Sequence, residues 1–305
     1  MRSEVEFYSC GELCRGWLYL PDEGAETGPW PAVVMAGGWC YVREFVMPQY
    51  AEHLARNGVA SLVFDYRNFG ASDGARRQHA DPWQQIEDYR SALSYLSGLQ
   101  DVDSERLGVW GISYSGGHVL ILAAIDRRIK AAVSVVPVID GEENMRRAHG
   151  HDRFIELRDL VETDRDERCH TGKPGGDIPY HTVDPTTDLC TWPFADSYTL
   201  FEDLRRQAPL FENRSTVESV DRLLTYSVFP YVARATRVPI AMIIAADDEK
   251  TPADLQVKAF DAIPNPHKVL IDLSGAGHRD LYAGETQIAQ AVASTVDWFT
   301  THLHI

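Results

Sequence analysis

The sequence predicts a doubly wound α/β fold, in which helices cover both faces of a mostly parallel sheet. Short, wholly apolar runs that fit strands buried on both faces alternate with amphipathic helical stretches. The alternation stops near Gly141 and resumes at Pro239, which indicates an inserted segment. A chain of 305 residues is long enough for one large core domain that carries such an insertion.

The predicted elements follow one another in a regular order. Two β-rich stretches flank a Gly-containing turn and form a hairpin, residues 4–8 and 14–20. A loop rich in Gly, Pro and acidic residues follows, from Pro21 to Pro31. Buried strands are then expected at residues 32–36, 59–64, 107–111 and 131–136, and residues 239–245 and 268–273 restore the strand pattern after the insertion. The helices are residues 47–54, 82–96, 119–125 and 288–303.

Helix-end signals support these boundaries. Asp81 is a predicted N-cap, because a proline and then Gln84 follow it at the first and third helical positions. From Gly141 onward, charged helical pieces, a Gly/Pro loop and aromatic clusters replace the strand rhythm. We therefore predict an α/β core of residues 1–140 and 238–305, with residues 141–237 as a mainly helical cap.

Composition excludes several classes of function. The net charge of −16 gives a general field that repels nucleic acid and anionic membranes. No apolar run approaches the ~18 residues of a membrane span, and the N-terminal residues lack the apolar core of a signal peptide. Five cysteines, an odd number, then indicate reduced thiols and a cytoplasmic location. The residues leave open whether the chain works as a monomer or as a homodimer.

One motif stands at the end of a predicted buried strand, Gly111-Ile112-Ser113-Tyr114-Ser115-Gly116-Gly117. The order of strand, sharp turn and helix places a serine at the apex, with a free backbone N–H beside it at a helix N-terminus. Ser115 offers a second serine in a shifted frame, but Gly111 just before the turn favours Ser113. The motif is short, and other α/β proteins have Gly/Ser turns of this kind, so the motif alone does not decide the function.

Two more polar loops directly follow predicted strands, where ligands bind in sheets of this kind. The loop after Ala245 contains Asp247 and Asp248, and the loop after Leu273 contains His278. A serine becomes a nucleophile when an imidazole takes its proton and a carboxylate orients that imidazole. The chain order of Ser, Asp and His is one of the known serine-triad orders.

These motifs resemble those of the α/β-hydrolase superfamily. The matching stretches stand in the family's order and are residues 35–39, 65–74, 111–117 and 277–278. Within the superfamily, the chain is similar to the esterase branch of dienelactone hydrolases, X-prolyl-peptidase-like esterases and fungal polyketide thiohydrolases or acyltransferases. The resemblance implies that Asp65, Arg67, Arg77 and Asp88 hold a loop by ion pairing, and we expect Asp272, inside a strand, to be structural.

The resemblance also assigns catalytic roles. It implies Ser113 as nucleophile, His278 as base and Asp248 as the carboxylate that orients the base. Pro252 selects Asp248 over Asp247, because the family usually has a proline four residues after the acid. Backbone N–H groups of Trp39 and Tyr114 would form the oxyanion hole, although Gly37-Gly38 stands where the family often has His-Gly.

The predicted function is hydrolysis of a small-molecule ester or thioester with a small to medium apolar acyl group. Aromatic residues of the cap are candidates for substrate binding, namely Trp192, Phe194, Tyr226 and Phe229. An acyltransferase with the same triad, a peptidase or amidase, and a non-catalytic receptor on the same fold are the alternatives. We expect no cofactor and no metal, since the spacing of His149, His151, Cys169, His170 and His181 matches no ligand pattern.

Overall fold

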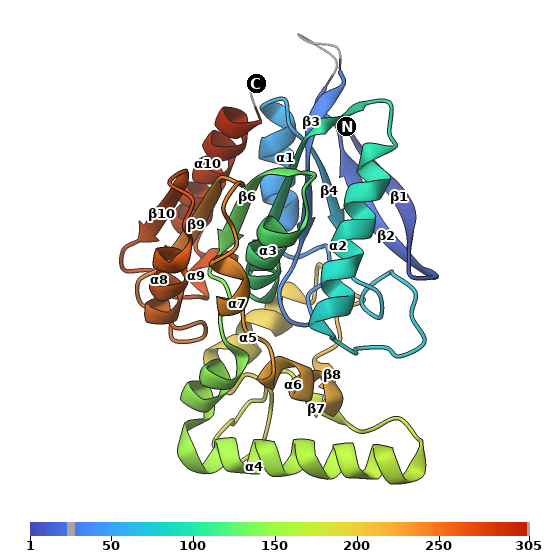
Figure 1. Cartoon of the computed structure of the whole chain (residues 1–305). Helices are drawn as coiled ribbons and strands as arrows, with labels where there is room; N and C mark the ends of the chain where they lie inside the picture. The colour runs from blue at the N-terminus through green and yellow to red at the C-terminus, as the bar shows by residue number, and fades with distance from the viewer. Residues whose placement is uncertain (23–27, 304–305) are drawn as a thin grey trace.

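The computed structural model describes residues 1–22 and 28–303 and has a twisted sheet between two layers of helices (Figure 1). The middle of the loop predicted from Pro21 to Pro31 therefore lies outside the described residues. The predicted hairpin and all six further predicted strands are present in this sheet. The doubly wound, mostly parallel α/β fold is thus confirmed.

The sheet has the strand order β1-β2-β4-β3-β5-β6-β9-β10. The β1/β2 and β2/β4 pairs are antiparallel, and every other neighbouring pair in this order is parallel. The strands are β1 (Arg2–Ser9), β2 (Glu12–Tyr19), β3 (Trp30–Ala36), β4 (Ala60–Phe64), β5 (Val102–Ile112), β6 (Ile129–Val135), β9 (Ile240–Ala245) and β10 (Lys268–Leu273). The parallel strands end together at one edge, so the loops after β3, β5, β9 and β10 can meet there.

Helices pack on the sheet from both sides. Helices α1 (Met47–Arg56) and α10 (Glu285–His302) contact each other and cover one face, whereas the other face carries α2 (Pro82–Ser97), α3 (Tyr114–Ile125) and α8 (Ala253–Ala262). The predicted N-cap is confirmed, because the Asp81 carboxylate accepts from the backbone N–H groups of Trp83 and Gln84 at 2.9 and 3.1 Å. Helix α8 and the short α9 (Asp280–Ala283) were not predicted from the sequence.

The chain between β6 and β9 lies beyond the end of the sheet at which the parallel strands terminate (Figure 1). Its elements are α4 (Gly141–Thr171), β7 (Asp177–Pro179), α5 (Ala195–Leu204), β8 (Arg214–Thr216), α6 (Val217–Leu224) and α7 (Phe229–Val232). Helix α4 bends at Gly150, which has a φ of 68°. We refer to this segment as the cap, and its boundaries at residues 141 and 237 stay predictions.

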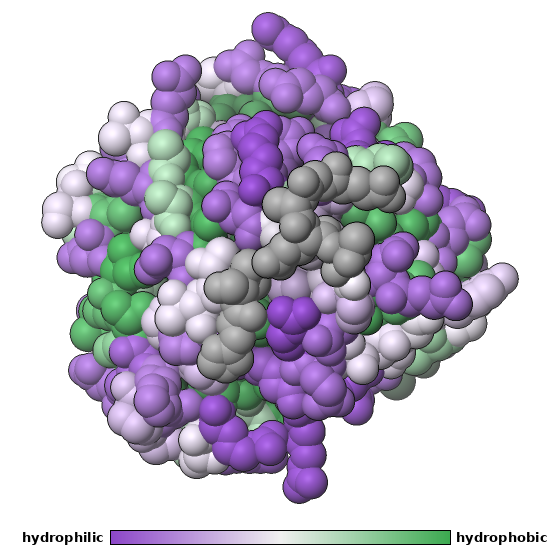
Figure 2. All heavy atoms as spheres, turned by 90° about the horizontal axis from the view of Figure 1, so that it is seen from above, coloured by the Kyte–Doolittle hydropathy of each residue, from purple (hydrophilic) through white to green (hydrophobic). Residues whose placement is uncertain are grey.

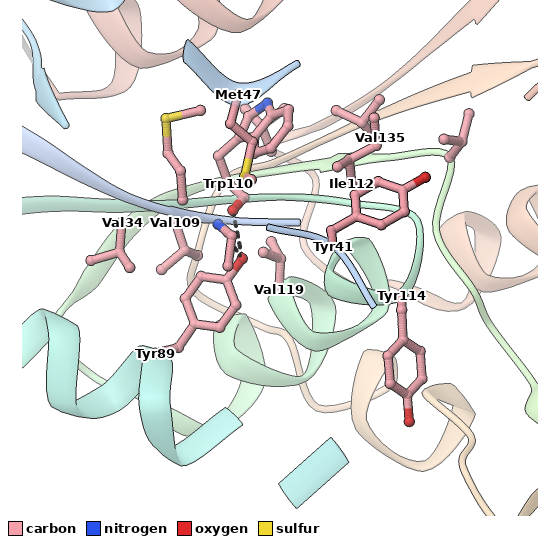
Figure 3. Close-up of a cluster of buried hydrophobic side chains, with 14 of the residues drawn as sticks. Val34, Tyr41, Met47, Tyr89, Val109, Trp110, Ile112, Tyr114, Val119 and Val135 are labelled. Carbon is pink, nitrogen blue, oxygen red and sulfur yellow. Dashed lines mark hydrogen bonds between the residues drawn. The ribbon is translucent and has the colours of Figure 1, made fainter. Parts of the chain in front are cut away.

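One buried tyrosine fixes the strand ends from which the polar loops start (Figure 3). The Tyr89 hydroxyl accepts from the Ala36 N–H at 3.1 Å and donates to the Trp110 carbonyl at 2.7 Å. Ala36 ends β3, and Trp110 lies two residues before the end of β5. Neighbouring side chains of this core, such as Val34 and Val109, have no exposed surface. The tyrosine thus holds the two central strands in register beneath the site.

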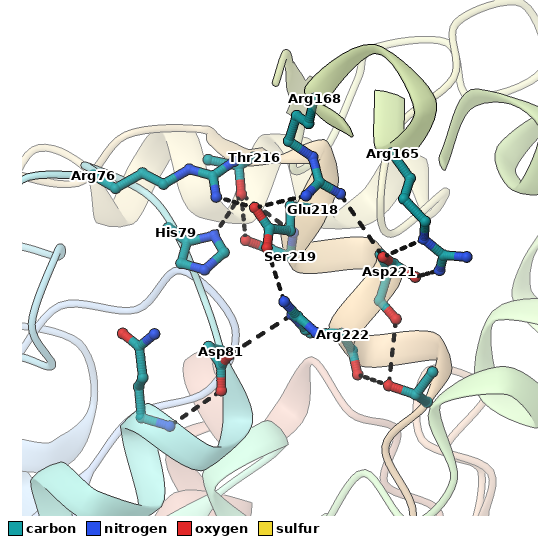
Figure 4. Close-up of polar contacts among 12 residues, drawn as sticks. Arg76, His79, Asp81, Arg165, Arg168, Thr216, Glu218, Ser219, Asp221 and Arg222 are labelled. Atoms are coloured by element: carbon teal, nitrogen blue, oxygen red, sulfur yellow. Dashed lines mark hydrogen bonds and ion pairs between the residues drawn. The ribbon is translucent and has the colours of Figure 1, made fainter. Parts of the chain in front are cut away.

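An ion-pair network joins the cap to the core loop before α2 (Figure 4). Glu218 in the cap pairs with Arg76 of the core loop and, at 3.3 Å, with Arg168 of α4. Arg222 of the same cap helix reaches Asp81 at 3.7 Å. Because several charges share partners and are partly buried, such a network orients elements better than isolated surface pairs do.

The residues to which the family resemblance assigned ion pairs hold the neighbouring loop, but not all of them by ion pairing. Arg67 pairs with Asp88, whereas Arg77 donates to the backbone carbonyl oxygens of Ser72 and Gly70. The Arg67 Nε–H donates to Asp88 at 2.7 Å, and Asp65 accepts from the backbone N–H groups of Arg43 and Ala71 at 2.7 and 2.9 Å. Asp272 is exposed on β10 at the edge of the sheet. The face of the molecule opposite the cap mixes hydrophilic side chains with smaller apolar areas (Figure 2). No helix among the described residues is long and apolar enough to span a bilayer.

Buried His118 predicts acid sensitivity of the fold. Its ring has no exposed surface and bonds the Tyr226 hydroxyl at 3.0 Å and the Gln85 amide oxygen at 2.9 Å. Burial lowers the pKa of His118 to about 3, so below pH ~6.5 the unfolded chain takes up a proton that the folded chain does not. We expect this group alone to cost about 2 kcal/mol of unfolding free energy between pH 7.5 and 5.0.

Urea denaturation of the wild type and of His118→Gln at these two pH values measures this effect. The glutamine variant should lose about 2 kcal/mol less than the wild type over the interval. Other buried histidines are common to both proteins and cancel in the comparison. Equal losses in the two proteins would contradict the prediction.

Candidate active site

Ser113 lies at the turn between β5 and α3, with a φ of 58° and a ψ of −118°. This conformation is rare for a residue with a side chain and holds the serine at the apex of the turn. Small neighbours allow it. A side chain at Gly111 would begin 2.4 Å from the Ser115 carbonyl oxygen, and one at Gly117 would begin 2.3 Å from the Val138 carbonyl oxygen. The glycines of the motif are therefore needed for strand and helix to approach so closely.

Ser115, the alternative serine, is fully buried and has a different set of contacts. Its hydroxyl donates to the Gly37 carbonyl oxygen and accepts from the Tyr66 hydroxyl at 2.5 Å. These bonds tie the loop after β3 and the loop after β4 to the start of α3. Ser115 is therefore a bracing residue, and Ser113 is the serine in the lining of the cavity beneath the cap.

The structure brings Asp248 and His278 together from the loops after β9 and β10. The His278 Nδ1–H donates to Asp248 Oδ2 at 2.8 Å, so the Nε2 atom carries the free lone pair of a neutral ring. Asp248 is held in turn by the backbone N–H groups of Lys250 and Thr251, at 2.9 and 2.8 Å. Asp247, the competing carboxylate, is exposed.

Backbone donors lie beside Ser113. Gly38 packs directly on it, because a Cβ at Gly38 would be 2.9 Å from the Ser113 Cβ and 3.3 Å from its Oγ. The next residue is Trp39, whose N–H donates to no other group in the described part of the chain. Tyr114 occupies the first position of α3, where an N–H has no partner within the helix. The Trp39 and Tyr114 rings pack at 5.0 Å and fix this corner.

Ser113 and His278 share a small cavity under the cap. Its aromatic walls come from the loop after β3, from the cap and from α9, and the lining residues are Tyr41, Ser113, Tyr180, His181, Trp192, Ser197, Leu200, Phe201, Lys250, His278, Arg279 and Tyr282. No carboxylate belongs to the part of this lining that the structure describes. Lys250 is paired with Asp196 at 2.9 Å.

Comparison with known proteins places this arrangement in a family. A sequence model of the X-Pro dipeptidyl-peptidase (S15) family matches residues 16–273. The chain belongs to this family. It is 32% identical to a thiohydrolase of Aspergillus aculeatus over 88% of this chain and 83% of the relative. It is 31% identical to a polyketide transferase of Aspergillus fumigatus, with 93% of each chain covered.

The fold agrees with this membership of the S15 family. The crystal structure of an α/β-hydrolase from a Penicillium species superposes with a TM-score of 0.83 at 27% identity, and both chains are covered completely. The α/β-hydrolase resemblance that was drawn from the motifs is therefore confirmed.

Of the four cap aromatics that were predicted to bind substrate in this S15 family member, some line the cavity and others do not. Trp192 lines the cavity, whereas Phe194 packs at 5.4 Å against the Lys250 ammonium beside it. Tyr226 packs beside the start of α3, with its ring 5.1 Å from that of Tyr114 and its hydroxyl on His118. Phe229 lies under the Lys258 ammonium at 5.1 Å. Neither Tyr226 nor Phe229 is in the cavity lining, because both are used in packing the cap onto the core.

Sequence reasoning missed several lining residues, above all Tyr41, Tyr180, His181 and Tyr282. Two of them had a signal, since Tyr41 follows Trp39 by two residues and Tyr282 follows His278 by four, one helical turn. Burial raises the pKa of Tyr282, and the Ser113 hydroxyl beside it acts in the opposite direction. Tyr180 and His181 lie in the cap, where no motif distinguishes them from packing residues.

Proposed function

We propose that this protein is a serine hydrolase that cleaves a carboxylic ester or thioester of a small to medium apolar acyl group through an acyl-enzyme on Ser113. One observation carries the proposal. Ser113, at the apex of a strained turn, shares a small cavity with His278, whose tautomer is fixed by Asp248. This is the set of groups that nucleophilic acyl transfer requires.

The first half of the reaction forms the acyl-enzyme. The Ser113 Oγ attacks the substrate carbonyl carbon while its proton passes to His278 Nε2, and Asp248 stabilises the resulting imidazolium. The negative oxygen of the tetrahedral intermediate accepts from the N–H groups of Trp39 and Tyr114. When the intermediate collapses, the bond to the leaving group breaks, and His278 returns its proton to the departing alcohol or thiol.

The second half releases the acid. A water molecule gives a proton to His278 and attacks the acyl carbon, and the proton then returns to the Ser113 oxygen as the ester bond breaks. An alcohol in place of water would give acyl transfer instead. The polyketide transferase among the relatives favours this second candidate, and product analysis with and without an added alcohol separates the two.

An ester or thioester fits the cavity better than a peptide with a free amino terminus. A free ammonium group needs a carboxylate partner when it is buried. The described lining of the cavity contains Lys250 and Arg279 but no Asp or Glu. The thiohydrolase among the relatives also supports a thioester substrate.

Covalent labelling tests the proposal directly. The wild type should react with a fluorophosphonate in one-to-one stoichiometry, and tandem mass spectrometry should place the adduct on Ser113, with none on Ser115. In parallel, p-nitrophenyl esters and N-acetylcysteamine thioesters of two to ten carbons should show turnover. An unlabelled Ser113, together with no turnover of any ester or thioester, would reject the proposed function.

A further inference from the structure

Three buried polar groups in the cavity lining have no hydrogen-bond partner among the described residues. One is the Tyr282 hydroxyl of α9, and the other two belong to the cap, the Nε2 atom of His181 and the indole N–H of Trp192. His181 and Trp192 are only 3% and 4% exposed. Buried polar groups in native proteins are nearly always paired, so the two cap groups, which take no part in the acyl-transfer steps, indicate places for a ligand.

His181 is a fixed hydrogen-bond acceptor. Its Nδ1–H donates to the Trp192 carbonyl oxygen at 3.0 Å, and a carbonyl can only accept, so Nδ1 carries the proton. Burial lowers the pKa of His181 to about 3, which keeps the ring neutral and leaves a bare lone pair on Nε2. The His181 ring stacks on that of Phe201 with 5.0 Å between the ring centroids, and the His181 backbone N–H donates to Asn213 Oδ1 at 3.0 Å. The His181 ring therefore cannot easily rotate to bring Nε2 to another hydrogen-bond donor of the protein.

Trp192 is a fixed hydrogen-bond donor. Its backbone N–H donates to the Tyr180 carbonyl oxygen at 3.0 Å, which holds it beside the segment that carries His181. Indole nitrogen only donates, and imidazole Nε2 in this tautomer only accepts. The two unpaired groups are therefore of opposite type, in two cap residues that line the same cavity and are joined by a hydrogen bond.

We propose that His181 and Trp192 bind an aliphatic hydroxyl group of the substrate, which donates to His181 Nε2 and accepts from the Trp192 N–H. A carboxylate or carbonyl would leave His181 unpaired, and an ammonium would leave Trp192 unpaired, whereas a hydroxyl satisfies both. The apolar walls at Leu200 and Phe201 suit the rest of the chain. The inference rests on the proposed function, and the hydroxyl belongs either to the acyl chain or to an acceptor alcohol.

Matched substrates test the proposal and separate the two sources. One arm compares hydrolysis of the hexanoyl thioester of N-acetylcysteamine with that of its 3-, 4-, 5- and 6-hydroxy derivatives. The other arm measures transfer of the hexanoyl group to 1-butanol in competition with water. In one of the two arms, the wild type should show a preference of about 10-fold in kcat/KM, the effect of one or two neutral hydrogen bonds. The preference is for the best hydroxyhexanoyl thioester over the hexanoyl thioester in the first arm, and for 1-butanol over water in the second.

Trp192→Phe is the informative variant, because it removes the donor and keeps an aromatic ring. It should reduce that preference several-fold. The matched control is Trp298→Phe, since the Trp298 N–H is also buried and has no partner within residues 1–22 and 28–303, but lies outside the cavity lining. This control should keep both the activity and the preference of the wild type. A wild type without preference in either arm, or an unchanged preference in Trp192→Phe, would overturn the proposal.

A binding measurement separates failure of this inference from failure of the proposed function. Calorimetry with the Ser113→Ala protein compares the binding of the hexanoyl and hydroxyhexanoyl thioesters without any chemistry. Tighter binding of a hydroxyl compound that disappears in Ser113→Ala/Trp192→Phe would support the hydroxyl site even if Ser113 proved not to be a nucleophile. If the wild type forms an acyl-enzyme on Ser113 but the hexanoyl and hydroxyhexanoyl thioesters bind equally, the hydroxyl does not come from the acyl chain. The transfer assay with 1-butanol then decides whether it comes from an acceptor alcohol.

Discussion

Replacing Ser113 with alanine is expected to lower kcat/KM for the best ester or thioester by about 10⁴-fold or more. The variant retains the cavity and the backbone donors but has no atom that can form the acyl-enzyme. Steady-state hydrolysis assays, with circular dichroism to verify folding, measure the effect. Because serine and histidine act as a unit, Ser113→Ala/His278→Ala should lose little more than Ser113→Ala alone.

The two adjacent aspartates give this prediction a matched control. Asp248 is buried and bonded to His278, whereas Asp247 is exposed. We expect Asp248→Asn to lower kcat by several orders of magnitude, because the amide cannot fix the same imidazole tautomer, and Asp247→Asn to retain wild-type rates. Wild-type hydrolysis by Ser113→Ala, or a reversed order of the two asparagine variants, would show that the assigned residues are wrong.

Replacing Gly38 with alanine is the second change with a large expected effect. The added methyl group would lie 2.9 Å from the Ser113 Cβ and 3.3 Å from the Ile112 carbonyl oxygen, closer than real Cβ contacts normally are. Either the loop or the nucleophile must move, which spoils the alignment of the Trp39 N–H with the developing oxyanion. Loss of one such donor costs about 10²- to 10³-fold in kcat.

Gly98→Ala is the matched control for this substitution. Gly98 caps the end of α2 with a φ of −91°, and an added Cβ would lie no closer than 3.5 Å to its nearest neighbour. It should leave kcat and KM unchanged. A folded Gly38→Ala protein with wild-type kcat would mean that the loop after β3 is not part of the oxyanion hole.

The core could be predicted from the sequence because its signals are local. A strand buried on both faces is a mostly apolar run, and five such runs form the buried parts of β3, β4, β5, β6 and β9. The sixth predicted strand, β10, lies at the edge of the sheet and is partly exposed. The Ser113 turn, the Asp81 N-cap and the loops that carry Asp248 and His278 are likewise written in consecutive residues. Their meeting at one edge follows from the parallel sheet, since parallel strands end on the same side.

The lining of the cavity could not be predicted in the same way. Trp192, Tyr226 and Phe229 are equally aromatic in the sequence, but only Trp192 lines the cavity, while the other two pack the cap onto the core. His181 looks like any other histidine of the cap until its Nδ1 is seen on the Trp192 carbonyl oxygen.

The sequence by itself therefore determined the α/β core and the order of Ser113, Asp248 and His278, because periodicity and strand-end motifs depend on residues close in the chain. Only the tertiary structure decided which serine lies in the cavity, which aspartate bonds the histidine and which cap side chains surround them. Those outcomes depend on contacts between segments far apart in the chain, such as Ser115 with Gly37 and His181 with Trp192. Local sequence patterns do not encode such contacts, because they form only when segments distant in the chain pack together beneath the cap.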